Sequence, residues 1–405
     1  MHVLFLAPDT HVYNHGFLRG LKSLGARVSA IGMAAQDRMS PDARHLLDGY
    51  RAVGKITDVP ALAAAAKELA APSFDRIETI DEPLVEPAAA LRGLLGVPGL
   101  ALATAKLCRD KVAMKEFLRG HGIPCAQTSR VANPADAHAF AERCGYPLIC
   151  KPLAGFGALL TFKVATVGEL DAALARLQPR AEQPIAIEEF IEGHEGFFDT
   201  LCDAQGVRHD FAAHYYPGCL EAAQHRWVSP QIAVTNRIEQ DGYRELRKMA
   251  HRVVDALGIR SAATHMEWFF GPKGLKFSEI GARPAGEKIW DMYGVGNDFD
   301  VYREWALAIL GMASEQAPSR RYATGSIQIR PSRDGKIVGH RGLDAAMQRC
   351  RAAIYEQSVP APGTPTKGLD KGWLCNTWFR LKHTDYDQLR DLMTFLGETV
   401  KADAQ

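Results

Sequence analysis

Apolar and polar residues follow a strand–helix–strand pattern at the start of the chain. Residues 3–7 form a short apolar run suited to a buried strand, and apolar residues recur at helical spacing over residues 17–24. Residues 27–31 form the next apolar run. This order predicts a βαβ unit and therefore a parallel sheet. The first turn lacks a G-x-G-x-x-G sequence, so the pattern does not favour a dinucleotide site.

Polar residues in this region have two interpretations. Asp81, Glu82 and Glu86 could form an acidic metal site, but a polar strand end and favourable charge near a helix N-terminus explain them better. His11 and His15 have the i, i+4 spacing of metal ligands, although loop histidines are usually solvated. We therefore expect the first 100 residues or so to form a compact α/β domain without chemistry of its own.

Two apolar and aromatic runs flank Gly271–Gly274, which reads G-P-K-G and is strong turn chemistry. The pattern predicts a β-hairpin. If its loop contains an odd number of residues centred near Lys273, Glu267 and Glu279 lie directly opposite each other on one face. A two-residue turn would instead place Glu267 opposite Ser278. Because side chains alternate along a strand, Met266, Trp268 and Phe270 would lie on the face opposite to Glu267.

Two carboxylates facing each other in a sheet repel, and burial increases that cost. A divalent cation between Glu267 and Glu279 removes the repulsion, and Mg²⁺ is commonly held by one or two carboxylates plus substrate phosphates. Arg283 follows four residues after Glu279, where its planar cation could bind a phosphoryl oxygen. An exposed hairpin with two solvated glutamates is the alternative.

Two lysines precede this hairpin. Residues 108–124 predict an amphipathic helix with Lys111 near its beginning, where a cation opposes the helix dipole unless it faces an anion. Residues 147–150 predict a strand that delivers Lys151, and a glycine-bearing loop follows. The backbone amides of such a loop can approach phosphates closely, although an ordinary hairpin would look the same.

A further predicted strand, at residues 184–187, ends in acidic residues. Glu188 and Glu189 follow it directly, and the apolar Phe190 and Ile191 come next. Acidic pairs at strand ends are commonly solvated. An apolar strand that ends in acids and then in apolar residues also suits a hinge that clasps an adenine.

The rest of the chain alternates between helices and strands, with no internal repeat, coiled coil or low-complexity tract. Further helices are predicted at residues 61–71, 133–144, 167–177, 243–257, 299–310 and 385–400. Further strands are predicted at residues 76–80, 197–202, 209–216, 326–330, 336–338, 352–355 and 373–380.

Composition narrows the class of protein. The 405 residues predict two to three domains, and 47% hydrophobic with 23% charged residues is typical of a soluble globular protein. A formal net charge of +1 does not favour general binding to nucleic acids or anionic membranes. No secretory signal or membrane span is expected. The eight cysteines include no C-x-x-C pair, so we expect no zinc or disulfide framework and a reducing, cytoplasmic location.

The order of these features resembles the ATP-grasp superfamily over about residues 1–320. The resemblance implies a mixed α/β and α+β architecture: a Rossmann-like pre-ATP-grasp domain at residues 1–106, an ATP-grasp domain at residues 107–315 and a β-rich C-terminal domain at residues 316–405. Within the ATP-grasp domain it implies a small lobe at about residues 112–187 and a large lobe at about residues 188–315, completed by the C-terminal domain. The two lobes would close on ATP.

The resemblance also implies roles for individual residues. Lys111 and Lys151 match the lysines that contact ATP phosphates, and Glu195 sits where an acid usually holds the ribose hydroxyls. Arg283 matches the arginine that faces the phosphates. The segment that would hold adenine, largely through backbone groups, is Glu188, Glu189, Phe190 and Ile191. The two ligands of Mg²⁺, or of Mn²⁺ in its place, are Glu267 and Glu279.

Two features depart from the superfamily pattern. Many relatives have Asn two residues after the second glutamate, where this chain has Gly281, so water or a substrate oxygen would have to complete the metal shell. The loop after Lys151 lacks the usual Gly-Ser-Gly run, although Thr161 could contribute a hydroxyl. The sequence EIGARPAGE is closer to the form found in the purine-biosynthesis branch and in L-amino acid ligase-like proteins.

The resemblance implies that a carboxylate is activated as an acylphosphate for attack by an amine, with release of ADP and phosphate. Glu287 and Arg330 fall where biotin carboxylase keeps its bicarbonate base and its enolate-stabilising arginine, so a carboxylase is an alternative. Against it, the MNTRIQVEH run and a biotin-carrier motif are absent. In a ligase, Arg330 would clamp the substrate carboxylate or acylphosphate instead. A non-catalytic nucleotide-binding subunit is a further alternative.

The small-molecule carboxylate and amine substrates are not evident from the sequence. Several aromatic and charged residues could line an acceptor pocket, although such residues are more often structural: His225, Arg226, Trp227, Glu287, Lys288 and Trp290. A homodimer is implied by the resemblance alone.

Overall fold

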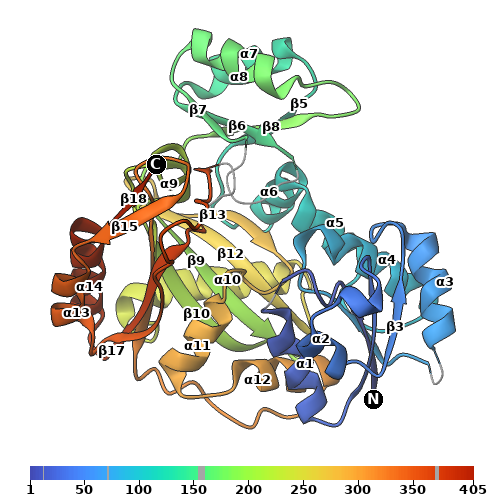
Figure 1. Ribbon diagram of the computed structural model, residues 1–405. Helices are drawn as coiled ribbons and strands as arrows, with labels where there is room; N and C mark the ends of the chain where they lie inside the picture. Colours follow the sequence, from blue (N-terminus) through green and yellow to red (C-terminus); the bar gives the residue numbers. More distant parts are fainter. Residues whose placement is uncertain (12, 71–72, 154–159, 370–373) are drawn as a thin grey trace.

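The computed structural model describes residues 1–11, 13–70, 73–153, 160–369 and 374–405. Its strands form two four-stranded sheets, one eight-stranded central sheet and one two-stranded ribbon. The four-stranded sheet with two helices at the top of Figure 1 stands above the rest of the molecule. The N-terminal domain lies at the lower right of the same view.

The N-terminal domain contains the predicted parallel sheet, with strand order β3-β2-β1-β4. Its strands are β1 (His2–Leu6), β2 (Arg27–Gly32), β3 (Gly49–Ala52) and β4 (Arg76–Glu78). Its helices are α1 (Asn14–Ser23), α2 (Pro41–His45), α3 (Val59–Leu69) and α4 (Val85–Leu95). The central strands β1 and β2 are almost entirely buried on both faces, as expected for a parallel sheet covered by helices, whereas the edge strand β3 is partly exposed.

Two consecutive helices lead out of this domain, where the sequence predicted one. They are α5 (Leu102–Arg109) and α6 (Lys111–Gly120). Asp110 separates them because its extended backbone ends α5, and its carboxylate caps α6 by accepting from the N–H groups of Val112 and Ala113. Lys111 is therefore the first residue of α6.

The small lobe is a four-stranded antiparallel sheet with two helices on one face. Its strands are β5 (Thr128–Val131), β6 (Leu148–Pro152), β7 (Phe162–Val164) and β8 (Ile185–Glu189), in the order β5-β8-β6-β7. Its helices are α7 (Pro134–Cys144) and α8 (Val167–Leu177), capped by the side chains of Asn133 and Thr166. The glycine-bearing loop predicted after Lys151, with Gly155 and Gly157, lies outside the described residues.

The central sheet combines strands from residues 194–281 with three strands from the C-terminal part of the chain, in the order β13-β12-β9-β10-β11-β14-β17-β16. These strands are β9 (His194–Cys202), β10 (Val207–Tyr216), β11 (Gln231–Val234), β12 (Ala262–Gly271), β13 (Gly274–Gly281), β14 (Ala323–Ile329), β16 (Ile354–Ser358) and β17 (Thr377–His383). The C-terminal segment thus contributes three strands to this sheet, besides a separate two-stranded ribbon.

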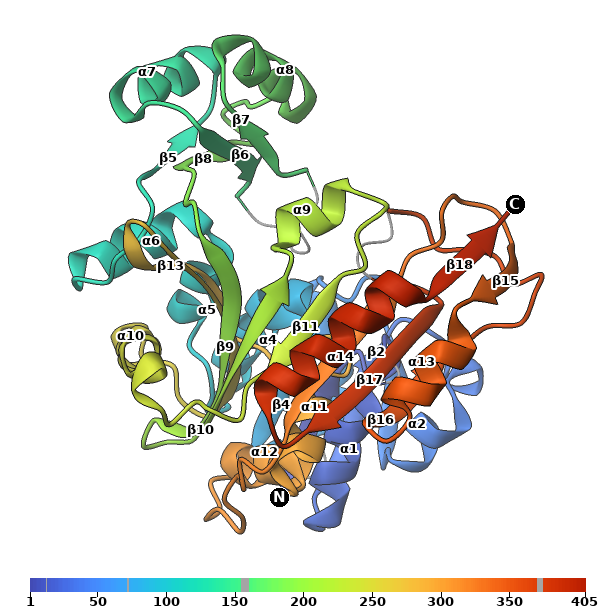
Figure 2. The same cartoon turned by 90° about the vertical axis from the view of Figure 1, so that its left-hand side faces the viewer.

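Helices cover the central sheet, and a ribbon closes the chain. The helices are α9 (Cys219–Gln224), α10 (Arg244–Ala256), α11 (Ile289–Asn297), α12 (Val301–Leu310), α13 (Leu343–Cys350) and α14 (Tyr386–Thr399). The ribbon consists of β15 (Ile337–Arg341) and β18 (Lys401–Ala404). Figure 2 shows α13 and α14 over the face of β16 and β17. Of these elements, α9, α11, α13 and β18 were not predicted from the sequence. Among the described residues, no helix is long and apolar enough to cross a bilayer.

The N-terminal domain packs directly on the central-sheet unit through α1. Phe17 on α1 contacts the rings of Trp290, Tyr302 and Trp305. A Cβ on Gly20 would lie only 2.3 Å from the Tyr302 carbonyl oxygen, so glycine is needed for this close approach of α1 and α12. The shared core fixes the N-terminal domain against the sheet that carries the predicted metal ligands.

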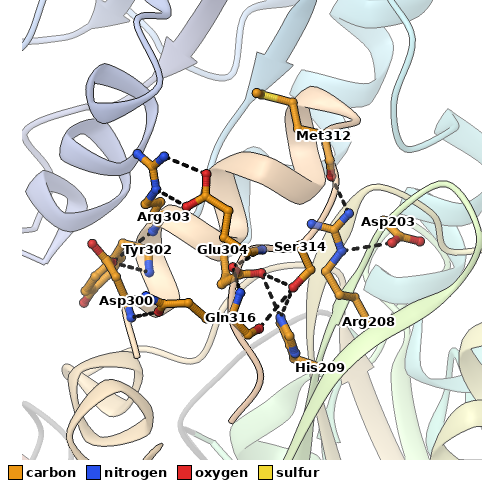
Figure 3. Close-up of polar contacts among 11 residues, drawn as sticks. Asp203, Arg208, His209, Asp300, Tyr302, Arg303, Glu304, Met312, Ser314 and Gln316 are labelled. Atoms are coloured by element: carbon orange, nitrogen blue, oxygen red, sulfur yellow. Dashed lines mark hydrogen bonds and ion pairs between the residues drawn. The ribbon is translucent and has the colours of Figure 1, made fainter. Parts of the chain in front are cut away.

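A buried glutamate on α12 binds the segment that follows this helix. Glu304 is 1% exposed, and its carboxylate accepts hydrogen bonds from the Ser314 hydroxyl at 2.7 Å and from the N–H groups of Glu315 and Gln316, each at 2.9 Å. Its other contact is with the His209 ring at 2.9 Å. Figure 3 shows Ser314, Gln316 and His209 around the Glu304 carboxylate. Burial would raise the pKa of Glu304, but these hydrogen bonds hold it below its ordinary value.

Candidate functional site

The predicted glutamate pair lies on the β12–β13 hairpin. Glu267 pairs directly with Glu279, as predicted. Of the two turns considered, the structure has the two-residue one, because Gly271 pairs with Gly274; regular alternation from that turn would place Glu267 opposite Ser278. A β-bulge restores the pairing: the register shifts after Glu267, which leaves Ser278 as the extra residue of β13.

The apolar residues of β12 largely occupy the opposite face. Met266 and Trp268 are buried, at 1% and 4% exposure, and contribute to a hydrophobic core. Phe270 was expected on the same face, but it lies near the turn and is 55% exposed. The buried pair anchors the middle of the strand, so the carboxylate of Glu267 is held toward the other face.

That other face forms the floor of a cavity of about 1400 Å³. Its walls come from the N-terminal domain, α6, the small lobe, α9 and the segment after β13. Predicted site residues on the cavity wall are Lys111, Lys151, Glu188, Glu189, Phe190, Ile191, Glu195, Glu267, Glu279, Arg283 and Glu287. Arg330 is the only predicted site residue that does not line it.

Lysines converge on Glu279 from two elements. The Lys111 ammonium at the start of α6 lies 3.1 Å from the Glu279 carboxylate, and the Lys151 ammonium on β6 lies 3.9 Å from it. Burial opposes ionisation of Glu279, but Lys111, Lys151 and Lys115 together hold its pKa well below the ordinary value. Glu279 is therefore ionised.

Glu267 is in the opposite electrostatic situation. Burial raises its pKa, and the neighbouring carboxylates of Glu279 and Glu195 raise it further. No described residue donates a hydrogen bond to its carboxylate. Two adjacent carboxylates, of which one lacks any donor, fit a divalent cation with oxygen ligands. Among the described residues, no group of three or more His, Cys, Asp or Glu side chains is arranged to hold a metal, so phosphate or water oxygens would have to complete the shell.

A lysine missed in the sequence analysis joins this cluster. The Lys115 side chain is 1% exposed and its ammonium lies 2.8 Å from Glu188, whose other oxygen lies 3.0 Å from the Lys151 ammonium. Glu188 thus bridges the buried Lys115 and the partly buried Lys151. Lys115 follows Lys111 by four residues, so the two share a helix face, and this spacing was the signal available in the sequence.

The predicted hinge connects the small lobe to β9. The N–H groups of Glu189 and Phe190 donate to the carbonyls of Gln127 and Pro147, which holds the segment within the small-lobe sheet. The Lys163 ammonium lies 3.9 Å from the centroid of the Phe190 ring. At this end of the cavity the wall therefore combines an aromatic ring with a lysine ammonium group.

Glu195 lies at the start of β9, on the face that carries Glu267. Its carboxylate accepts a hydrogen bond from the Cys219 N–H, at the start of α9, at 2.6 Å. Burial raises the pKa of Glu195. A carboxyl group at this depth in the cavity wall can accept from a hydroxyl, as the ribose role requires.

The N-terminal domain contributes residues to the cavity wall, and its lack of chemistry of its own stays a prediction. Glu82 receives a hydrogen bond from Arg283 Nε at 2.7 Å and another from Arg109 Nη1 at 2.6 Å. Asp81 and Tyr13 line the same wall, and His11 lies 3.9 Å from Asp81. His15 is buried on α1 instead. The separation of Glu82 and Arg283 by 201 residues left no local signal for this contact.

A histidine on β12 was also missed. His265 Nδ1 lies 2.7 Å from Asp199, and the other Asp199 oxygen accepts from the Tyr293 hydroxyl at 2.6 Å. His265 precedes Glu267 by two residues, so both side chains lie on the cavity face. The strand alternation could have identified it.

Glu287 and Arg330 occupy different surroundings. Glu287 has a left-handed backbone, as does Lys288 after it, with φ of +57° and +60°. Burial raises the pKa of Glu287 to about 7, against the influence of Arg380 and Lys367. Arg330 instead donates to the carbonyl oxygens of Ala222 and His225, and so supports the segment behind the cavity wall.

The other residues considered for an acceptor pocket are dispersed. His225 lines the cavity and stacks on Trp227, whose side chain is 80% exposed. Arg226 pairs with Asp334. Two further members face elsewhere: Lys288 pairs with Glu356, and Trp290 is buried in the core beside α1.

Comparisons with known proteins agree with this geometry. Residues 110–287 match the family described as carbamoyl-phosphate synthase L chain, ATP binding domain. The L-arginine-specific L-amino acid ligase of Bacillus subtilis is 30% identical over 267 residues, which is 64% of this chain and 63% of that protein. The alignment thus spans less than two thirds of this relative's length.

Solved structures share the fold over the whole chain. The L-amino acid ligase from Bacillus licheniformis superposes with a TM-score of 0.78 at 18% identity, covering 100% of this chain and 98% of that one. A biotin carboxylase from Campylobacter jejuni, in complex with an ATP analogue, gives a TM-score of 0.70 at 15% identity over 99% and 91% of the two chains. The mixed α/β fold predicted from the sequence is confirmed, because the chain shares the fold of these ligase and carboxylase structures over its whole length.

Proposed function

We propose that this protein is an ATP- and Mg²⁺-dependent ligase that joins a small-molecule carboxylate to an amine and releases ADP and phosphate. The observation that carries the proposal is the pairing of Glu267 with Glu279 on the cavity floor, beneath Lys111 and Lys151. Phosphoryl transfer depends mainly on positioning and charge stabilisation, and these are the groups that it requires.

The residues present fit a nucleotide that enters from the small-lobe side. The base would lie at the hinge of Glu188–Ile191 beside Phe190, and Glu195 would accept from the ribose. Lys111 and Lys151 would turn from Glu279 toward the phosphates, because a phosphate chain offers more negative charge than one carboxylate. Lys151 would keep its contact with Glu188, which limits the rearrangement.

Glu267 and Glu279 would hold Mg²⁺, with Mn²⁺ as a substitute. The ion, when bound, would neutralise charge on the phosphates during transfer. Arg283 would bind an oxygen of the transferred phosphoryl group. Lobe closure over the cavity would exclude water, which protects an acylphosphate from hydrolysis.

The size of the cavity supports a second and third ligand beside the nucleotide. Its volume of about 1400 Å³ exceeds the range typical of a single small-molecule site, roughly 300–1,000 Å³. Glu287 lies on the wall beyond Arg283, and its raised pKa of about 7 suits a group that takes a proton from an attacking amine. Amino acids are the first substrates to test, because the Bacillus subtilis relative is an L-amino acid ligase.

The position of Arg330 does not favour carboxylase chemistry. Its guanidinium is bound to two backbone carbonyls and does not line the cavity. A role in clamping the substrate carboxylate would need this side chain to release both carbonyls. Cytoplasmic location, a homodimer and the division into domains at residues 106 and 315 stay predictions.

The test is a screen for phosphate release with ATP, Mg²⁺, amino acids and small carboxylates, followed by mass spectrometry of the products. We expect ADP, phosphate and an amide in equal amounts. AMP with pyrophosphate would contradict the acylphosphate route. Tight nucleotide binding without turnover on any substrate pair would favour the non-catalytic alternative.

A substitution tests the metal assignment within the same assay. Glu279→Ala should lower kcat by about 10³-fold or more, since it removes a carboxylate that contacts the ion at the reacting phosphates. The matched control is Glu142→Ala, at an exposed position of α7 outside the cavity. If Glu279→Ala retained normal turnover, the metal site would have to lie elsewhere.

A further inference from the structure

Gly281 is one of the two departures from the superfamily pattern, and the structure shows what occupies the space that a side chain would fill there. A Cβ built on Gly281 would lie 2.8 Å from Oε2 of Glu82. The backbone of Gly281 is not in the left-handed region, so an L-residue could adopt its conformation. Space for the Glu82 carboxylate, rather than backbone freedom, is therefore what glycine provides at this position.

The Glu82 carboxylate binds two arginines from different elements. Arg283 follows β13 and donates from Nε at 2.7 Å, while Arg109 ends α5 and donates from Nη1 at 2.6 Å. All three side chains are largely buried. Burial would raise the pKa of Glu82, but Arg283 and Arg109 hold it below its ordinary value, so the carboxylate is ionised.

These contacts determine the orientation of the Arg283 guanidinium. Its Nε is fixed by Glu82, and its Nη1 donates to the Pro284 carbonyl at 2.7 Å. Nη2 makes no hydrogen bond with any described residue, and Arg283 lines the cavity. Because a guanidinium is planar, fixing Nε and Nη1 also fixes the direction in which the N–H groups of Nη2 point.

We propose that Glu82 is a positioning residue, which reaches from the N-terminal domain into the space left by Gly281 and fixes Arg283 for the terminal phosphate of the nucleotide. The proposal rests on the proposed function, because the role of Arg283 toward phosphate belongs there. Through Arg109 the same carboxylate also fixes the end of α5, two residues before Lys111. The Glu82 carboxylate thereby fixes both the orientation of Arg283 and the position of the segment that carries Lys111.

The competing explanation is a purely structural ion pair that docks the N-terminal domain. The two explanations differ in what the loss of Glu82 does to nucleotide binding. A docking contact affects stability and all ligands alike. A positioning contact affects a ligand that carries the terminal phosphate and spares one that lacks it.

The experiment measures the affinities of Mg²⁺–ADP and of a Mg²⁺-bound β,γ-imido analogue of ATP by calorimetry, together with thermal unfolding, for the full-length chain. Glu82→Gln should weaken the analogue by about tenfold, because a neutral amide holds a guanidinium much less firmly than a carboxylate does, while ADP affinity changes by less than about twofold. In the activity assay kcat should fall more than the KM for ATP rises.

The matched control is Glu78→Gln. Glu78 is also a buried carboxylate of the N-terminal domain and pairs with Arg92 at 3.3 Å, but neither residue lines the nucleotide cavity. This variant should lower the unfolding temperature and leave both nucleotide affinities unchanged. Equal losses for ADP and the analogue in Glu82→Gln, or a loss of stability alone, would overturn the proposal.

A double-mutant cycle tests the role of Gly281 independently. Gly281→Ala should displace the carboxylate and reproduce the loss seen in Glu82→Ala. The double variant should be no worse than either single one, because the collision disappears with the carboxylate. Additive losses, or a Gly281→Ala variant with unaltered analogue affinity, would refute the proposal. Failure of the unaltered protein to bind either nucleotide would refute the proposed function, and this inference with it.

Discussion

Two buried glutamates in this protein have opposite environments. Glu304, on α12, accepts hydrogen bonds from a hydroxyl and two backbone N–H groups and contacts a histidine ring (Figure 3), and its pKa is lowered. Glu267, on β12, has no hydrogen-bond donor among the described residues, faces two other carboxylates, and has a raised pKa.

The difference lies in the partners that each carboxylate finds within the chain. The cost of burying Glu304 is offset by hydrogen bonds from its own chain. The cost of burying Glu267 beside Glu279 is not offset by any hydrogen bond from the described residues, and under the proposed function Mg²⁺ would supply the missing partner. A buried carboxylate without hydrogen-bond donors is therefore a useful place to look for a ligand.

The largest effect on stability should come from Glu304→Gln. The amide would retain one acceptor oxygen and turn an NH₂ group toward buried donors, which should cost about 2–4 kcal/mol in the free energy of unfolding. Urea denaturation monitored by tryptophan fluorescence measures it. Glu315→Gln, which removes a solvent-exposed partner of Arg303, should cost far less, because exposed ion pairs contribute little to stability, and it serves as the control. If both substitutions lowered the free energy of unfolding equally, the hydrogen bonds of the buried Glu304 would not be what offsets its burial.

Glu267→Gln should have the opposite sign. In the nucleotide-free protein it removes the repulsion with Glu279, so stability should be unchanged or higher by up to about 1 kcal/mol. The stabilisation that Mg²⁺ with an ATP analogue gives to the unaltered protein should be largely lost. Thermal unfolding with and without these ligands tests both parts. If Glu267→Gln destabilised the nucleotide-free protein and left the stabilisation by Mg²⁺ with the analogue intact, Glu267 would have a structural role like that of Glu304.

A third prediction concerns the pH dependence of stability at Glu287. Its folded-state pKa of about 7 lies above the ordinary value of 4.5 because of burial, so the folded protein retains a proton that the unfolded chain has lost. The resulting stability is fully present below about pH 4.5 and is lost as the pH rises through 7. Glu287→Gln should therefore flatten the decrease in unfolding temperature between pH 5 and 8. A parallel decrease in both proteins would contradict the assigned environment.

Local patterns predicted much of the fold and part of the site. The alternation along residues 264–281 predicted the hairpin, and short apolar runs predicted the parallel sheet. These two predictions are confirmed, and both depend on residues close together in the chain. The facing glutamates were expected for an odd-length loop, and the structure instead aligns them through a bulge. Lys111 and Lys151 were placed at one anionic site by the resemblance, and both approach Glu279.

Contacts between distant segments could not be predicted in the same way. Glu82 looked like a solvated acid at a strand end, because nothing near it in sequence indicates Arg283 or Arg109. The bulge at Ser278 has no local signal either, since serine is ordinary in a strand. Arg330 was assigned from its place in a resemblance, and only tertiary structure shows that its guanidinium is engaged by α9 and the residue after it.

The extra residue at Ser278 has a consequence for recognising chains of this kind. Phe277 and Glu279 are two positions apart, yet Phe277 pairs with Trp268 and Glu279 with Glu267, whose side chains point to opposite faces of β12. A sequence search that demands strict two-residue alternation along the second strand would pass over such chains. A search that permits one inserted position between the aromatic residue and the second acid would retrieve them.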